Sequence, residues 1–223
     1  MLNIQLIGTE YGSTALDLDL VPDGSTIVSA GVGEDISFDM ELIRLKNCNV
    51  IGIDPTEKSK VFVEKNSHPK FHFLNKALFA ESGVKIKMFR NANPSHVSDS
   101  VTATHKAVSG NNCYYVETTS IPELLVAYPD ISLIKLDIEG AEYETLASLK
   151  TLDVPQLCVG FHLFCTDFTL NHTIQVASHI LSLGYVIANI INRNGPMSEV
   201  LFVHQKCLTK TKFNKTRELS GIA

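Results

Sequence analysis

The sequence lacks tryptophan, a long apolar run and any Cys-x-x-Cys pair. Because a helix that spans a bilayer needs about 20 consecutive apolar residues, we expect no membrane segment and no membrane partner. Five scattered cysteines, an odd number, argue against a disulfide framework and a zinc site, so we expect reduced, mostly buried thiols. The first residues show no basic stretch followed by an apolar core, which argues against a signal peptide. These absences predict a soluble, cytoplasmic protein.

An excess of positive charge is also absent. Nineteen Lys and Arg residues stand against 24 Asp and Glu, a formal net charge of −5. Proteins whose main task is to bind nucleic acid usually carry a basic surface, so we expect a small-molecule substrate and no nucleic-acid partner. The one basic run, between Lys206 and Arg217, is interpreted as a solvated tail. The composition is compatible with a monomer or a homodimer.

No internal repeat, low-complexity segment or Pro/Gly-rich linker divides the 223 residues. With 44% hydrophobic residues the chain can bury one sizeable core. We therefore predict a single domain over residues 1–223. It comprises an N-terminal extension (1–24), a core (25–204) and the basic tail (205–223).

Short β-branched runs alternate with helical patterns along this core, beginning with the run Ser25–Ala30. This alternation predicts an α/β fold with a mostly parallel sheet. Two final runs, residues 185–191 and 199–204, are separated by a short turn and predict a C-terminal antiparallel hairpin. Residues 91–112 are polar and aperiodic, which indicates a long loop of the kind that often covers a functional site.

Two glycines, Gly31 and Gly33, follow the first predicted strand and allow the backbone to turn sharply against a ligand. A dinucleotide fingerprint would need a third glycine where this chain has Ile36. Glu34 and Asp35 would repel a pyrophosphate and suit a ligand with a cationic amino group. A plain tight turn without a ligand is the alternative.

Asp54 ends the second predicted strand, 21 positions after Gly33. An acid at about this distance from a glycine turn reaches a ribose diol, where one carboxylate accepts both hydroxyl groups. The alternative is that Asp54 caps the helix that follows Thr56. Together with the two glycines, Asp54 predicts a nucleoside site.

Three carboxylates, Asp137, Glu139 and Glu142, stand within six residues where another predicted strand ends. Such a cluster of like charges needs a cation, a hydroxyl-rich substrate or a metal ion to compensate it. For Glu142 the alternative of a favourable position at a helix N-terminus weighs more. His162 ends the next strand at the same edge and is our candidate general base, with a core histidine as the alternative.

These segments resemble a known family. Residues Lys135–Glu142 are similar to the K-[IL]-D-[IV]-E-G-x-E signature of FkbM-type, S-adenosylmethionine-dependent methyltransferases. Four further segments resemble motifs of the same family in the same order: Ser29–Asp39, Ile53–Thr56, Asn75–Leu78 and Gly160–His162. The resemblance covers about residues 8 to 204.

The resemblance implies a Rossmann-like class I methyltransferase fold and S-adenosyl-L-methionine as cofactor. The cofactor-binding residues that it implies, together with those argued above, are Gly31, Gly33, Glu34, Asp35, Asp54, Ala77 and Asp137. Many members carry an acid before the first glycine, where this chain has Ser29 and Ala30. Glu34, Asp35 or Asp137 would then have to supply the negative charge for the methionine ammonium group.

We expect O-methylation of a small hydroxyl-bearing or sugar-like acceptor. His162 and Asp137 are the predicted catalytic residues, and Glu139 and Tyr11 the predicted substrate-binding residues. No metal ligands are predicted, although Asp137 and Glu139 leave a divalent metal open. The alternatives are a catalytically silent S-adenosylmethionine-binding module and, disfavoured by Ile36, a nucleotide-dependent oxidoreductase.

Overall fold

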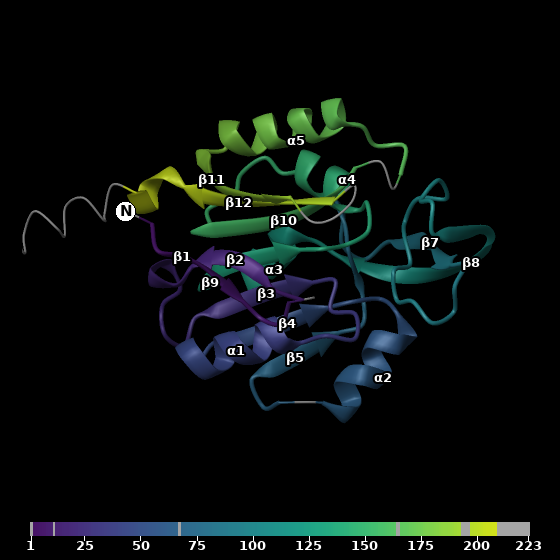
Figure 1. The fold of residues 1–223 in the computed structure, drawn as a ribbon, viewed down its shortest axis with the longest axis horizontal. Helices are drawn as coiled ribbons and strands as arrows, with labels where there is room; N and C mark the ends of the chain where they lie inside the picture. Colours follow the sequence, from purple (N-terminus) through teal and green to yellow (C-terminus); the bar gives the residue numbers. More distant parts are fainter. Residues whose placement is uncertain (1, 11, 67, 164–165, 193–196, 209–223) are drawn as a thin grey trace, which may run out of the picture.

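The computed structural model describes residues 2–10, 12–66, 68–163, 166–192 and 197–208. Within them a seven-stranded sheet runs in the order β11-β12-β10-β9-β3-β4-β5 (Figure 1). Its strands are β3 (Thr26–Ala30), β4 (Asn49–Ile53), β5 (Phe71–Leu74), β9 (Ile131–Leu136), β10 (Gln156–His162), β11 (Tyr185–Asn192) and β12 (Met197–His204). Neighbours from β10 to β5 pair in parallel, whereas β12 runs antiparallel to both β10 and β11. The mostly parallel sheet with a C-terminal antiparallel hairpin is confirmed.

Helices cover both faces of this sheet. They are α1 (Ser37–Lys46), α2 (Glu57–Lys65), α3 (Ile121–Ala127), α4 (Glu142–Ala147) and α5 (Leu170–Ser182). Apolar residues of α3, α4 and α5 form one buried cluster with the sheet, and those of α1 and α2 form another on the opposite face. Figure 1 shows α4 and α5 above the sheet and α1 and α2 below it. None of the described helices is long and apolar enough to cross a bilayer.

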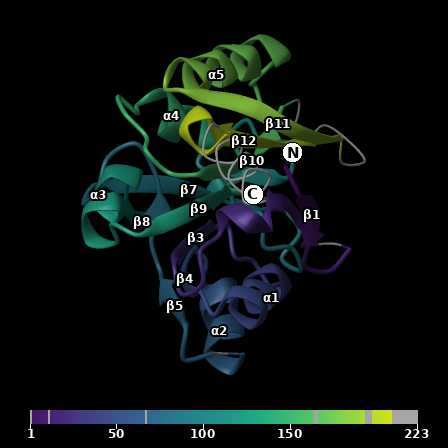
Figure 2. The ribbon, with the colours of Figure 1, turned by 90° about the vertical axis from the view of Figure 1, so that its left-hand side faces the viewer.

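The N-terminal extension forms a ribbon of two antiparallel strands, β1 (Ile4–Ile7) and β2 (Thr14–Asp17), followed by a short 3-10 helix, η1 (Leu18–Leu20). The ribbon lies beside α1 (Figure 2) and belongs to the same buried cluster, in which Leu16 is fully buried. Gln156 of β10 fixes the ribbon by accepting from the backbone N–H of Asp17 and donating to its carbonyl. Strand β2 of this extension is therefore packed into the core.

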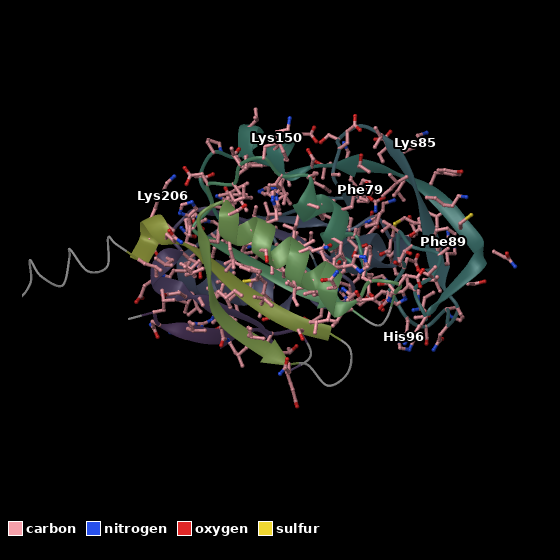
Figure 3. The ribbon with its side chains drawn as sticks, turned by 90° about the horizontal axis from the view of Figure 1, so that it is seen from above. Phe79, Lys85, Phe89, His96, Lys150 and Lys206 are labelled. Atoms are coloured by element: carbon pink, nitrogen blue, oxygen red, sulfur yellow. The ribbon has the colours of Figure 1, made fainter. Side chains whose placement is uncertain are left out.

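A second sheet carries the strands β6 (Ala77–Leu78), β8 (Val108–Thr119) and β7 (Lys85–Asn91), in that order. Residues 108–112, predicted as loop, are the first part of β8, so this part of the loop prediction was wrong. Val108 pairs with Asn91 of β7 and Cys113 with Phe89, and a shift of register leaves residues 109–112 between these two pairs. In Figure 3 this sheet, with Lys85 and Phe89 labelled, lies at the opposite end of the molecule from Lys206.

The cysteines only partly follow the expectation of buried thiols. Cys48 and Cys158 are buried, whereas Cys113 on β8 is exposed. The thiol of Cys158 donates to the carbonyl of Ala15 at 3.1 Å, which links β10 to the N-terminal ribbon. The buried thiols thus serve packing, and Cys113 does not.

The strand order creates a switch point between β3 and β9. From β3 the chain continues to β4 and β5 on one side, and it returns to β9 and β10 on the other. Connections therefore leave the carboxyl ends of β3 and β9 in opposite directions, which opens a crevice where open α/β sheets bind ligands.

Candidate active site

A cavity lies at this switch point, and Gly31 shapes its floor. Gly31 has φ +83°, and a Cβ at this position would stand 1.7 Å from the carbonyl oxygen of Asp137. Its N–H donates to Ile53 at the end of β4 at 2.9 Å, and the N–H of Asp137 donates to Ala30 at 3.0 Å. Only glycine fits here, because the ends of three strands meet around it.

Asp54 is buried and lines the same cavity. Its Oδ1 accepts from the backbone N–H of Thr56 at 2.8 Å and from the hydroxyl of Thr56 at 2.6 Å. Its Oδ2 accepts from the N–H of Gly33 at 3.0 Å. Thr56 in turn caps α2 by accepting from Ser59. Asp54 therefore holds the N-cap residue Thr56 in place and does not cap α2 itself. Its Oδ2 keeps acceptor capacity because a carboxylate oxygen can accept two hydrogen bonds.

The structure separates the two acids after the glycines. Asp35 accepts from the N–H of Ser37 and the hydroxyl of Thr9, both at 2.7 Å, and so fastens the N-terminal ribbon to the start of α1. Burial works to raise the pKa of Asp35, but these hydrogen bonds outweigh it and the pKa is lowered. Glu34 is exposed at the rim of the cavity, which Ala77 of β6 also lines.

Glu142 at the start of α4 is fully buried, so it is a structural clamp rather than a solvated acid. Its Oε2 accepts from the N–H of Gly140 at 2.8 Å. Its Oε1 lies 2.8 Å from the backbone nitrogen of His162 and 3.1 Å from Nδ1 of the same residue. Glu142 therefore ties the loop after β9 to the end of β10.

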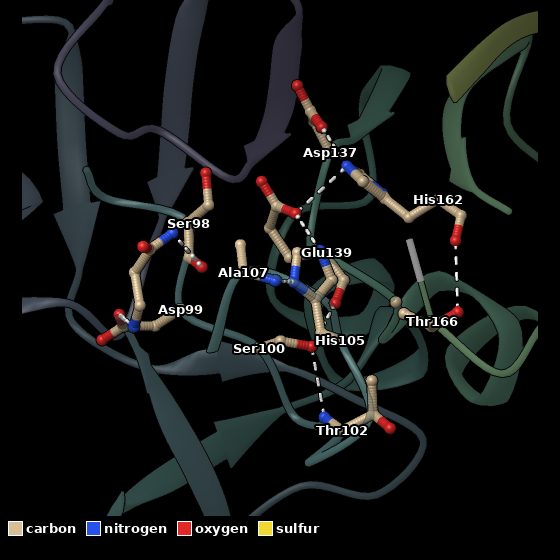
Figure 4. Close-up of polar contacts among 12 residues, drawn as sticks. Ser98, Asp99, Ser100, Thr102, His105, Ala107, Asp137, Glu139, His162 and Thr166 are labelled. Carbon is tan, nitrogen blue, oxygen red and sulfur yellow. Dashed lines mark hydrogen bonds and ion pairs between the residues drawn. The ribbon is translucent and has the colours of Figure 1, made fainter. Parts of the chain in front are cut away.

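The other ring nitrogen of His162 faces the cavity carboxylates (Figure 4). Nε2 lies 3.4 Å from both Oδ1 of Asp137 and Oε2 of Glu139. Burial opposes a charged imidazole, but Glu142, Glu139 and Asp137 outweigh it and raise the pKa of His162 to about 10. With Glu142 at Nδ1 and two carboxylates at Nε2, the geometry favours the doubly protonated imidazolium.

Glu139 sits in the left-handed region, with φ +53°, which is uncommon for a residue with a side chain and concentrates at functional sites. Its Oε2 lies 3.1 Å from Nε2 of His105, and its carbonyl accepts from the hydroxyl of Ser100 at 2.5 Å (Figure 4). Burial works to raise the pKa of Glu139, but His105 and His162 outweigh it and the pKa is lowered. The predicted loop thus folds over the carboxylate cluster.

The predicted site residues come together in one cavity: Gly31, Gly33, Glu34, Asp35, Asp54, Ala77, Asp137, Glu139 and His162 all line it. Tyr11 lies outside the described residues. His105 was missed, because one histidine in an aperiodic polar loop carries no positional signal. Among the described residues, no group of three or more His, Cys, Asp and Glu is arranged to hold a metal ion.

Comparison with known proteins agrees with this architecture. A family model described as the methyltransferase FkbM domain matches residues 25–187. Fibrillarin, a pre-rRNA processing protein of Methanococcus jannaschii, superposes with a TM-score of 0.51 at 8% identity, over 91% of this chain and 83% of that one. Precorrin-6y C5,15-methyltransferase of Geobacter metallireducens gives a TM-score of 0.48 at 12% identity, with 84% and 85% covered. No curated protein matches the chain.

The sheet order, the glycine turn at the switch point and the acid at the end of β4 define a class I methyltransferase fold. The matched family model covers most of the chain. The protein belongs to the FkbM methyltransferase family and is an S-adenosylmethionine-dependent methyltransferase.

Proposed function

We propose that this protein transfers the methyl group of S-adenosylmethionine to a hydroxyl group of a small, hydroxyl-bearing or sugar-like acceptor. The observation that carries the proposal is that one cavity joins a nucleoside half, around Gly31 and Asp54, to a polar half, around Asp137 and His162. Methyl transfer needs a bound donor and an acceptor oxygen in contact, since most of the rate comes from holding the two in line.

The residues of the nucleoside half fit the cofactor. The turn at Gly31 and Gly33 leaves no side chain between the backbone and a ligand above β3. Oδ2 of Asp54 faces the cavity with acceptor capacity left for a ribose hydroxyl. Apolar surface suited to the adenine ring comes from Met88, Val97 and Val101.

The cofactor supplies an electrophilic methyl group on a sulfonium sulfur. Transfer of this methyl group from sulfur to an acceptor oxygen would require a base of the protein to take the hydroxyl proton. His162 already holds two ring protons and accepts no third, so it is poorly suited to the role of base expected from sequence. Asp137 is 42% exposed in the cavity and is the group we assign as the proton acceptor.

His162 then acts as a fixed positive charge. Its Nε2 is held toward Asp137 and Glu139 by the contact of Nδ1 with Glu142. This arrangement keeps two carboxylates together without strong repulsion. Oε2 of Glu139 contacts both His162 and His105, and we assign this carboxylate to acceptor hydroxyl groups at the edge of the cavity.

The test is turnover with S-adenosylmethionine and a panel of polyols, sugars and phenols, followed by mass spectrometry for a gain of one methyl group. Asp137→Asn should lower kcat by about 10²- to 10⁴-fold on an accepted substrate, the usual contribution of a general base. The matched control is Glu144→Gln, an exposed acid on α4, which should leave kcat unchanged. Binding of S-adenosylhomocysteine without transfer to any acceptor would contradict the transferase and favour the silent binding module.

A further inference from the structure

Two buried polar atoms next to the cavity have no hydrogen-bond partner: Oδ1 of Asp39 and Oγ1 of Thr14. Asp39 is 2% exposed on α1 and Thr14 is 1% exposed on β2, and both line the cavity. Nearly all buried polar atoms in folded proteins are hydrogen-bonded, and an unpaired carboxylate oxygen is especially costly. Two such atoms at one end of one cavity indicate that a polar ligand group completes them.

Lys135 brings a positive charge to the same end of the cavity. It pairs in register with Ser29 of β3 and Cys158 of β10, on the sheet face that α1 and the N-terminal ribbon cover. It also lines the cavity. No ion pair joins Lys135 to Asp39 among the described residues, although its charge acts on that carboxylate. A cation and an anion that face one cavity unpaired suit a ligand that carries both charges.

The acids expected to meet an ammonium group are engaged elsewhere. Asp35 accepts from Ser37 and Thr9 and is covered by Gly12, where a Cβ would lie 2.6 Å from its Oδ2. Asp137 faces His162, and Glu34 is exposed. The carboxylate of Asp39 interacts with the hydroxyl of Ser29 and with its own backbone, and its Oδ1 has no hydrogen-bond partner among the described residues.

We propose that Asp39, Thr14 and Lys135 form the subsite for the amino-acid end of the cofactor. Asp39 and Thr14 accept hydrogen bonds from the ammonium group, and Lys135 pairs with the carboxylate. This inference rests on the proposed function and names three residues that were not among the predicted cofactor-binding residues. In this arrangement the adenosine part of the cofactor binds at Asp54, and the acceptor binds beside Asp137 and His162.

Burial raises the pKa of Asp39 to about 6, which agrees with a carboxylate that lacks a partner until a cation arrives. Lys135 lowers this pKa and Asp35 raises it. An ammonium group favours the ionised form of Asp39, so the cofactor should bind more weakly as the pH falls below about 6.

Two ligands allow the contributions of the two ends of the cofactor to be measured separately. S-adenosylhomocysteine carries the amino-acid end, whereas 5′-methylthioadenosine keeps the nucleoside and lacks that end. In calorimetric titrations at pH 7.5, Asp39→Asn should weaken S-adenosylhomocysteine by about 10- to 100-fold, as expected for a lost charged hydrogen bond. It should change the affinity for 5′-methylthioadenosine less than about twofold. Asp54→Ala should weaken both ligands.

The matched control is Glu41→Gln, which removes an exposed carboxylate of α1 that lines no described cavity and should change neither affinity. Lys135→Met and Thr14→Val provide independent variants, each expected to weaken S-adenosylhomocysteine alone. Equal loss of both ligands in all three variants, or no loss in any, would overturn the subsite. If the unaltered protein binds neither ligand, the proposed function itself fails and the subsite falls with it.

Discussion

Asp39 and His162 are buried ionisable residues that line one cavity, and the pKa of each is raised for a different reason. Burial without an ion-pair partner raises the pKa of Asp39 to about 6. His162 is buried too, but three carboxylates outweigh that burial and raise its pKa to about 10. The free protein thus destabilises one charge and stabilises the other, as expected where binding a ligand must compensate a buried acid.

The ionised carboxylate of Asp39 should lower the free energy of unfolding of the ligand-free protein, and this cost should depend on pH. Its pKa of about 6 lies above the ordinary value of 3.8, so the folded state binds more protons between about pH 4 and pH 6. The free energy of unfolding therefore falls as the pH rises through this window. Asp39→Asn should be more stable than the unaltered protein by about 1–3 kcal/mol at pH 7.5, a gain that shrinks toward pH 4.

Urea denaturation at pH 4.5 and pH 7.5 measures this difference. Loss of stability in Asp39→Asn at pH 7.5 would show that the carboxylate is a structural group with a partner inside the protein. A gain in stability joined to a loss of cofactor affinity is the pattern expected of a binding residue, because function and stability then oppose each other.

At the scale of elements, the pair Glu142–His162 connects the start of α4 to the end of β10. Breaking a buried ion pair from one side leaves the other charge uncompensated and costs about 3–5 kcal/mol. We therefore expect Glu142→Gln and His162→Gln each to destabilise the protein by about this amount. The double variant should cost less than the sum of the two.

The pH dependence of the same pair follows from the raised pKa of His162. The stability that its charge contributes is fully present below about pH 6.5 and is lost as the pH rises through about 10. The difference in unfolding free energy between the unaltered protein and His162→Gln should shrink over this range. Additive single costs, or a difference that grows toward pH 10, would contradict a charged pair.

Elements whose sequence ends in a functional motif were predictable, and elements defined by long-range pairing were not. Strands β3, β4, β9 and β10 combine β-branched cores with a glycine, acid or histidine at the carboxyl end, so both the strand and its site residues follow from local pattern. Near the start of β8, residues 109–112 read Ser-Gly-Asn-Asn and carry no strand signal; they lie in a register shift between Val108, which pairs with Asn91, and Cys113, which pairs with Phe89.

The site residues likewise fall into those that the sequence could predict and those that it could not. Gly31, Asp54 and Asp137 could be assigned from spacing, because each ends a strand at the same edge of the sheet. Thr14 and Asp39 could not, since one lies on a ribbon and the other inside a helix, and only tertiary packing brings them together. His105 depends on the fold of residues 92–107 for the same reason.

For the molecule as a whole, the sheet order decides where chemistry takes place. The switch between β3 and β9 brings the glycine turn, the acid of β4 and the carboxylates after β9 to one cavity. The N-terminal ribbon and α1 contribute Thr14 and Asp39 to its lining. The segment of residues 92–107 contributes Val97 and Val101 and contacts Glu139 through His105. Cofactor and acceptor would therefore meet between two segments that lie far apart in the sequence.

A crystal structure of the protein with S-adenosylhomocysteine tests this account most directly. The account predicts the ribose hydroxyls on Asp54, the ammonium group on Asp39 and Thr14, and the sulfur facing the side of Asp137 and His162. Electron density for the ligand outside this cavity, or within it with the amino-acid end turned away from Asp39, would contradict it.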